Sequence, residues 1–277
     1  MSKEKCLCML LGRWLYYFLI ASQLFIVASC ATLPLGEPVS EEEQLAIAQD
    51  FQALVDSQQG CMGQIDADIS VRFEKLLQHG RINGYLLAMP PAYLRFDGIN
   101  PLGLTEVIFS TDGHQFTLVT VRKQMAYTGP VTAEKIQQYI PQGFTEDFVY
   151  LLNGLLPNAE EIRVWRVRKQ EKGSDFWLDL DYPDSSKTIK VLYRSDTHAI
   201  DRIIITPPES KDSVIVSYRY DDNSLKKSCP EPQSIGVDRD GSGVVIIDFS
   251  KRYPVPSLTK ERFQVVVPPN YKQVTVL

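Results

Sequence analysis

The chain has 277 residues, of which 23% are charged, and a formal net charge of −5. This acidic balance, without a stripe of Lys and Arg interleaved with aromatic residues, excludes nucleic acid as the partner, because a polyanion ligand needs clustered positive charge. It also gives no support for a basic face that binds lipid headgroups.

The first 30 residues have the order of a bacterial secretory signal, in which positive charge precedes an apolar run and then small residues. The charges are Lys3, Lys5 and Arg13, and the apolar run extends from Trp14 to Ala28. Residues 27–30, Val-Ala-Ser-Cys, resemble the lipobox that lipoprotein signal peptidase cleaves. Cleavage leaves a diacylated Cys30 as the first mature residue and removes a segment of net charge +2, so the remaining chain carries −7.

An uncleaved anchor is the alternative, because the apolar stretch from Cys6 to Ala28 approaches the roughly 20 residues that span a bilayer. Either interpretation places the rest of the chain outside the cytoplasm. In bacteria that sort lipoproteins by the residue after the cysteine, Ala31 implies the outer membrane, with the domain lipid-anchored on the periplasmic face. We therefore expect a signal peptide over 1–29, a lipidated cysteine and tether over 30–39, and one domain over 40–277.

Two cysteines remain for the domain. Cys6 and Cys8 leave with the signal and Cys30 takes the lipid, so Cys61 and Cys229 are left. In an oxidising compartment these two can form a disulfide, which would stabilise the domain by roughly 2–5 kcal/mol. Two unpaired thiols are the alternative.

The domain begins with a helix and continues as strands. Ser40 and Glu43 have capping-box spacing, and four apolar residues then follow on one helical face, namely Leu45, Ala48, Phe51 and Val55. The period changes to two at Ile65–Glu74, which predicts a strand with one polar face. Further strands, separated by turn signals, are predicted at Ile82–Met89, Tyr93–Phe96, Thr105–Phe109 and Phe116–Val121.

Residues 132–156 interrupt the strands with two helical segments, Thr132–Ile140 and Thr145–Leu152. Strands resume afterwards, at Ile162–Val167, Asp175–Leu180, Thr188–Tyr193, Ala199–Ile205, Ser213–Tyr220, Gly243–Phe249 and Phe263–Val267. About a dozen strands and three helices predict a mainly β (α+β) domain, in which the helices partly cover the concave apolar face of a curled antiparallel sheet. Such a sheet either closes tightly on itself or encloses a cavity.

The sequence carries no motif for catalysis or for a cofactor. The three histidines, His79, His114 and His198, form no His-x-x-x-His pair, and none accompanies a Gly-x-Ser-x-Gly turn. Nucleotide-binding glycine loops are also absent. We therefore expect neither an enzyme nor a metal or cofactor site.

Two acidic patterns allow a second interpretation. Residues 238–243, Asp-Arg-Asp-Gly-Ser-Gly, resemble the start of a calcium loop, but Phe249 stands where the final Glu of such a loop belongs, which favours a hairpin turn. Asp66 and Asp68 lie two apart on the polar face of a strand, where a solvated surface is favoured over an acid–base pair.

Tyr93-Leu94-Arg95-Phe96, with Asn100-Pro101-Leu102-Gly103 after it, resembles the LolB family of outer-membrane lipoprotein receptors and, more broadly, LolA/LolB-like domains. In that family a strand runs into an Asn-Pro-Leu-Gly loop, and two lid helices precede a Leu-rich Gly-Leu-Pro ending, which Phe148–Pro157 matches here. The resemblance covers about Leu45 to Ile205. It implies an incomplete antiparallel β-barrel with a helical lid and an apolar cavity that takes acyl chains.

The resemblance also implies a function without covalent chemistry. LolB-like receptors accept acylated lipoproteins from a periplasmic LolA-type carrier and place them in the outer membrane, and the leucine of the loop, here Leu102, is implicated in membrane insertion. Between Pro101 and Gly103 this side chain can project into lipid, with a gain of about 1.5–3 kcal/mol. The alternative is a leucine folded back into the core. The C-terminal extension through Phe263–Pro269 makes this chain longer than a typical member.

Two main hypotheses follow, and a hydrolase is a third, disfavoured one. The first is a receptor that binds acyl chains in its cavity, needs no ATP, and derives direction from the relative affinities of carrier, receptor and membrane. The second is a divergent envelope lipoprotein of the same fold with a filled core, which acts as a structural or interaction subunit.

Overall fold

The computed structural model describes residues 36–61, 63–75, 78–131, 148–156, 162–171, 173–182, 187–208, 213–239, 243–254 and 257–277. All of them belong to one compact unit, Gly36–Leu277, and its hydrophobic clusters lie within that unit. Cys30, the predicted helix Thr132–Ile140 and the turn residues 240–242 lie outside the described residues. Within these ranges, no helix is both long and apolar enough to cross a membrane.

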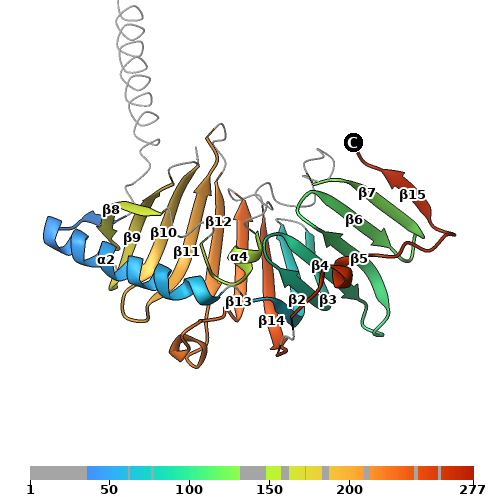
Figure 1. Ribbon diagram of the computed structural model, residues 1–277, viewed down its shortest axis with the longest axis horizontal. Helices are drawn as coiled ribbons and strands as arrows, with labels where there is room; N and C mark the ends of the chain where they lie inside the picture. The colour runs from blue at the N-terminus through green and yellow to red at the C-terminus, as the bar shows by residue number, and fades with distance from the viewer. Residues whose placement is uncertain are drawn as a thin grey trace, which may run out of the picture. The chain divides into compact units, whose positions relative to one another are not determined.

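The unit is built around one sheet of fifteen strands, which curls without closing (Figure 1). The spatial order is β1-β8-β9-β10-β11-β12-β13-β14-β2-β3-β4-β5-β6-β7-β15. Neighbours pair antiparallel, except β15, which pairs parallel to β7. This architecture confirms the predicted fold class.

The strands have the following bounds: β1 Glu37–Pro38, β2 Ile65–Lys75, β3 Gln78–Met89, β4 Tyr93–Ile99, β5 Thr105–Thr111, β6 Gln115–Thr120, β7 Met125–Pro130, β8 Arg163–Lys169, β9 Asp175–Asp181, β10 Thr188–Arg194, β11 Ala199–Thr206, β12 Val214–Arg219, β13 Ser234–Arg239, β14 Val244–Arg252 and β15 Lys272–Thr275. The α-helices are α2 Glu41–Gln58 and α4 Phe148–Leu152. Short 3-10 turns are η2 Gln59–Cys61, η4 Ser224–Lys226 and η5 Lys260–Phe263.

Strand β2 has the predicted two-residue alternation and separates the two faces of the sheet. Ile65, Ala67, Ile69 and Val71 are buried, whereas Phe73 on the same face is 45% exposed. We call the side of the sheet that carries them the inner face and the opposite side, which carries Asp66 and Asp68, the outer face. Because side chains alternate along every strand, the register with β2 assigns each residue of the sheet to one face.

Helix α2 begins as predicted, with the Ser40 side chain accepting a hydrogen bond from the Glu43 N–H at 3.2 Å. The helix lies across the inner face of β8 to β12 (Figure 1), and it buries Phe51, Leu54 and Val55 there. The prediction was wrong for Leu45, which is 61% exposed. The first turns of α2 extend past the edge of the sheet (Figure 1), so part of the apolar face lies beyond the strands that the structure describes.

Five segments differ from the sequence-based prediction, namely the unpredicted strands β1, β7, β13 and β15 and one predicted strand that does not form. Strands β7 and β13 were missed, because each contains a glycine and few consecutive apolar residues. The strand predicted at Phe263–Val267 is wrong. Phe263 ends the 3-10 turn η5, and it is buried against Leu87 on the outer face. This segment is apolar because it packs on the sheet, without pairing as a strand.

Residues 257–271, which we call the C-terminal strap, cross the outer face of β3 to β5. Arg95 donates from one guanidinium nitrogen to the backbone oxygens of Arg262 and Gln264, each at 3.2 Å, and the Ser110 hydroxyl donates to the Phe263 carbonyl. The strap then leads into β15, which pairs with β7 at the sheet edge. The C-terminal extension therefore protects an edge strand that would otherwise present unpaired backbone groups.

Candidate functional site

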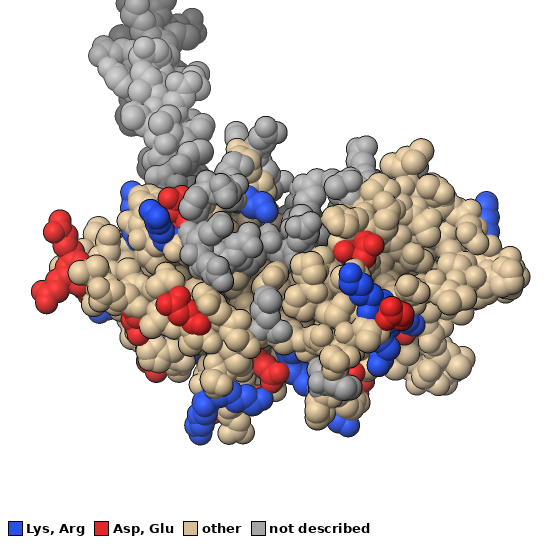
Figure 2. Space-filling model, viewed as in Figure 1, with Lys and Arg blue, Asp and Glu red and all other residues tan. Residues whose placement is uncertain are grey.

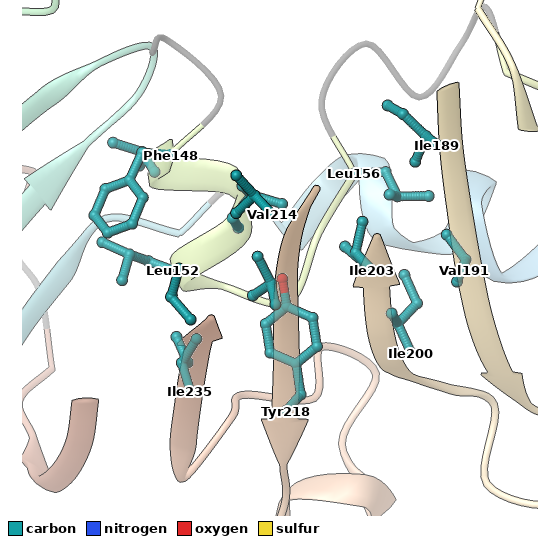
Figure 3. Packing of buried hydrophobic residues seen from close by; sticks show 14 of the residues in the cluster. Phe148, Leu152, Leu156, Ile189, Val191, Ile200, Ile203, Val214, Tyr218 and Ile235 are labelled. Atoms are coloured by element: carbon teal, nitrogen blue, oxygen red, sulfur yellow. The ribbon is translucent and has the colours of Figure 1, made fainter. Parts of the chain in front are cut away.

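The inner face is filled where the two helices cover it. Val191, Ile200 and Ile203 are completely buried there. Leu152 of α4 points toward Ile235, and Leu156, just after α4, points toward Ile203 (Figure 3). This part of the sheet is packed as a protein core.

Helix α4 is short, and its end is fixed by the Gly-Leu-Leu sequence that follows it. The Gly154 N–H donates to the Leu151 carbonyl at 3.1 Å, and the Leu155 N–H donates to the Tyr150 carbonyl at 3.0 Å. Gly154 has φ +71°, so these bonds form the Schellman motif that ends many helices. The turn directs Leu155 and Leu156 into the core, where each is 5% exposed. Only the end of the predicted helix Thr145–Leu152 lies within the described residues.

Strands β4 to β7 present a different inner face. Phe96, Phe109, Leu118 and Tyr127 occupy directly paired positions on these four strands, and we call them the apolar row. All four side chains are only partly buried, and they pack against the edges of two hydrophobic clusters. The row is therefore a continuous apolar surface, perpendicular to the strands, that the described helices do not bury.

Two glycines let the apolar row lie close to the backbone. Gly84 and Gly98 are paired across β3 and β4. A Cβ atom at Gly84 would lie 2.5 Å from the Phe96 ring, and a Cβ at Gly98 would lie 2.5 Å from Ile82 and 2.6 Å from Val107. Side chains at these positions would displace the neighbouring apolar groups, so the glycines shape the floor beside the row.

The loop between β4 and β5 holds Leu102 in solvent. The Asn100 side chain accepts hydrogen bonds from the N–H groups of Leu102 and Leu104 at 2.9 and 3.0 Å, and the Gly103 N–H donates to the Asn100 carbonyl at 2.9 Å. Gly103 has φ +80°, a conformation that favours glycine. Leu102 is 84% exposed, so it is not folded back into the core.

The loop and the apolar row belong to the same part of the sheet, because Phe96 and Phe109 lie on the two strands that the loop connects. Leu104 beside the loop is also exposed, at 62%. An exposed apolar tip and a partly buried apolar surface therefore share β4 and β5. Pro101, between Asn100 and Leu102, is exposed as well.

Helix α2 is held in place by side-chain hydrogen bonds to the sheet and by a disulfide beyond its C-terminal end. The Tyr193 hydroxyl donates to Asp50 of α2 at 2.6 Å and contacts His198 Nδ1 at 3.0 Å. Burial and then the Asp50 carboxylate raise the pKa of Tyr193 above its ordinary value. Beyond the end of α2, Cys61 and Cys229 form a disulfide. The part of the inner face under α2 is thus held closed by several independent contacts.

The acidic pair on β2 has structural partners on the outer face. Asp66 accepts a hydrogen bond from the Tyr85 hydroxyl at 2.7 Å, and Asp68 accepts one from the Tyr253 hydroxyl at 2.6 Å. Burial and then the Asp66 hydrogen bond raise the pKa of Tyr85 to about 12. The two carboxylates therefore hold tyrosine side chains of β3 and of the segment after β14 in place on the outer face. This structural role explains the acidic pair without an acid–base function.

Charged groups do not gather into one basic surface on the face that Figure 2 shows, where Lys and Arg are interspersed with Asp and Glu. Strands β13 and β14, on either side of the predicted turn at 238–243, pair from Asp238 and Val244 onward as a hairpin. In the ranges that the structure describes, no group of three or more His, Cys, Asp or Glu could hold a metal ion.

The residues of the site were only partly evident from the sequence. The loop Asn100-Pro101-Leu102-Gly103 was identified from its motif. The apolar row was missed, because Tyr127 lies on the unpredicted strand β7 and because a row across strands is visible only when the register is known. The alternation of Phe116 and Leu118 was the one available signal, and it indicated a strand without indicating its neighbours.

Comparison with known proteins identifies the fold. No protein-family model and no curated protein sequence matches the chain. A LolA superfamily protein from Nitrosomonas europaea matches with a TM-score of 0.53 at 9% identity, over 79% of this chain and 97% of that one. A DUF1329 family protein from Desulfovibrio piger matches with a TM-score of 0.53 at 8% identity, over 78% of this chain and 97% of that one. The chain therefore has a LolA-like fold.

Proposed function

We propose that this chain is an envelope lipoprotein, anchored through Cys30 to the outer membrane, whose inner face binds the acyl chains of lipoproteins and passes them to that membrane. The donor would be a soluble carrier of the LolA type. The single observation that carries the proposal is the apolar row on β4 to β7, which remains partly exposed next to a fully packed core. Apolar surface of this kind is stabilised by an apolar ligand.

The geometry of the row suits an acyl chain better than a compact ligand. Directly paired positions on neighbouring strands repeat every ~4.8 Å, so four of them form a band roughly 14 Å long from the first Cα to the last. An extended chain of about twelve methylenes has a similar length, and each buried methylene contributes about 0.8 kcal/mol. Binding would need no covalent step, since the chains only exchange one apolar environment for another.

Leu102 supplies the second part of the proposal. The Asn100 hydrogen bonds and the conformation of Gly103 hold the loop in a single shape, so little conformational entropy is lost when Leu102 enters a bilayer. The loop connects two strands of the apolar row. We infer that it brings the bound acyl chain close to the membrane that receives it.

A second candidate is an interaction subunit of the envelope, and the filled inner face under α2 and α4 favours it. In this case the row would be covered by another protein, and the domain would carry no acyl cargo. The two candidates differ in whether the isolated domain binds a free lipopeptide.

The experiment is a titration of the unit Gly36–Leu277 with a diacylated lipopeptide, followed by displacement of an apolar fluorescent dye. We expect saturable one-to-one displacement by the native unit and at least tenfold weaker binding by Leu118→Glu, which places a charge in the row. Thr117→Glu is the matched control, because Thr117 is the preceding residue on β6 and faces the outer side. An absence of displacement by the folded native unit would support the interaction subunit instead.

A further inference from the structure

The outer face carries a concavity, separate from the apolar row, with a volume of about 480 Å³. Its floor is a single register row across five strands. In order along the row these positions are Arg202, Ser217, Gly236, Ile246 and Arg72. Paired residues share one face of a sheet, so two small residues lie between longer side chains. We call this concavity the outer trough.

Gly236 deepens the trough, although the fold does not require a glycine there. Its backbone is not in the left-handed region, and the nearest heavy atom to an added Cβ would be the Ser217 Cβ, at 4.0 Å. That distance is an ordinary contact. In contrast, a Cβ at Gly98 would lie 2.5 Å from Ile82. Since glycine weakens a strand, its presence at 236 has no explanation in packing.

The arginines at the trough are not equivalent. Arg72 pairs with Asp248 at 3.0 Å, and Arg219 contacts the same carboxylate at 3.4 Å. Arg202, at the other end of the row, has a buried Nε atom without a hydrogen-bond partner. No ion pair reaches its guanidinium within the described residues. Arg202 therefore lines the concavity as a cation without an ion pair to a described residue, and a guanidinium in this setting can bind an anion.

The remaining walls mix apolar and polar side chains, because Ser234 and Asp238 also line the trough. Ile215 and Val244 are partly exposed and line the trough together with Ile246. Ile215 lies on β12 beside Ser217, and Val244 lies on β14 beside Ile246. The trough thus combines the guanidinium of Arg202 with an apolar path over Gly236 toward Ile246, and Asp238 lies beside this path, between Ile215 and Val244 in the next register row.

We propose that the outer trough binds a monoanionic amphiphile, in which a phosphate or carboxylate group lies on Arg202 and a short apolar chain extends over Gly236 toward Ile246. The site differs from the acyl-binding surface of the proposed function in both face and chemistry, and it does not depend on it. A free inorganic anion and the headgroup of a lipid could both bind Arg202 through the same charged group. The apolar side chains beside Gly236 favour the amphiphile, because only the amphiphile has an apolar chain to place on them.

Calorimetric titration of Gly36–Leu277 with n-octyl phosphate, below the concentration at which it forms micelles, tests the proposal. We expect one-to-one binding that is at least tenfold tighter than that of inorganic phosphate or of the neutral n-octyl glucoside. Arg202→Gln should weaken octyl phosphate at least tenfold, and Gly236→Val should abolish binding by filling the apolar path. Arg194→Gln should leave it unchanged, because Arg194 lies outside the trough and pairs with Asp196.

Each other outcome would overturn part of the proposal. Equal affinity for inorganic phosphate would make the trough a site for the free anion alone, and unchanged affinity in Arg202→Gln or Gly236→Val would place binding elsewhere. Leu118→Glu separates the two faces, because octyl phosphate bound to the apolar row would be lost in this variant and trough binding would not. If Gly236→Val does not fold, Gly236→Ala is the smaller substitution that replaces it in the binding test. The unfolding midpoint of every variant is measured before binding.

Discussion

Removing the Leu102 side chain should weaken membrane contact without changing the stability of the domain. Leu102 is 84% exposed and lies outside the main hydrophobic cluster of the described residues, so Leu102→Ala should alter the free energy of unfolding by less than about 0.5 kcal/mol. If the leucine enters the bilayer, its loss removes about 1.5–3 kcal/mol of apolar burial. That energy corresponds to a partition coefficient roughly 10-fold to 150-fold lower.

The assay is cosedimentation of Gly36–Leu277, without its lipid, with vesicles, combined with transfer of a bound lipopeptide to those vesicles. Val266→Ala is the matched control, because Val266 is an aliphatic residue of the C-terminal strap that is 91% exposed. Leu102→Ala should lose vesicle association and transfer while it still binds the lipopeptide. Unchanged association in Leu102→Ala, or an equal loss in Val266→Ala, would refute the assignment of Leu102 to the membrane contact.

Three further changes test the fold around the site. Gly98→Val should lower the free energy of unfolding, measured in urea, by about 1–3 kcal/mol, because the added side chain overlaps the packed inner face. Gly236→Val, the control, should be nearly neutral. Equal effects of the two substitutions would contradict the role of Gly98. Replacing Cys61 and Cys229 by Ala should lower stability by roughly 2–5 kcal/mol, since the disulfide joins residues 168 apart in sequence, and an unchanged urea midpoint would argue against this. Tyr85 should titrate near its pKa of about 12. The folded state holds the Tyr85 proton more tightly than the unfolded chain does. The protonated Tyr85 therefore contributes its full share of stability below pH 10, and this share is lost as the pH rises toward 12. In Asp66→Asn, absorbance titration should show a lower pKa of Tyr85 than in the native unit.

Local patterns predicted the elements whose signal is local. The alternation in β2, the Ser40 cap of α2 and the Asn100 loop each depend on residues close in sequence, and each occurs as expected. The exposure of Leu45 could not be predicted, because helical periodicity identifies an apolar face and does not show where the sheet under it ends. The strand predicted at Phe263–Val267 failed for a similar reason. A segment that packs on the surface of a sheet and a strand that pairs within it contain the same types of apolar residue.

The parts of the two candidate surfaces that depend on register were beyond the sequence. The apolar row and the outer trough each combine residues from four or more strands, and strand order is set by long-range pairing that no local pattern encodes. Gly236 illustrates this point. In the sequence it marks a weak strand, and only its place between Ser217 and Ile246 shows that it opens a concavity.

Photochemical crosslinking tests whether the inner face binds an acyl chain. A lipopeptide with a diazirine near the middle of one acyl chain would be bound to Gly36–Leu277, irradiated, and the labelled residues identified by mass spectrometry. We expect labels on Phe96, Phe109, Leu118 or Tyr127, and we expect these labels to be lost when unlabelled lipopeptide competes. Labels confined to the outer face, or no specific label on a folded domain, would contradict acyl binding by the inner face.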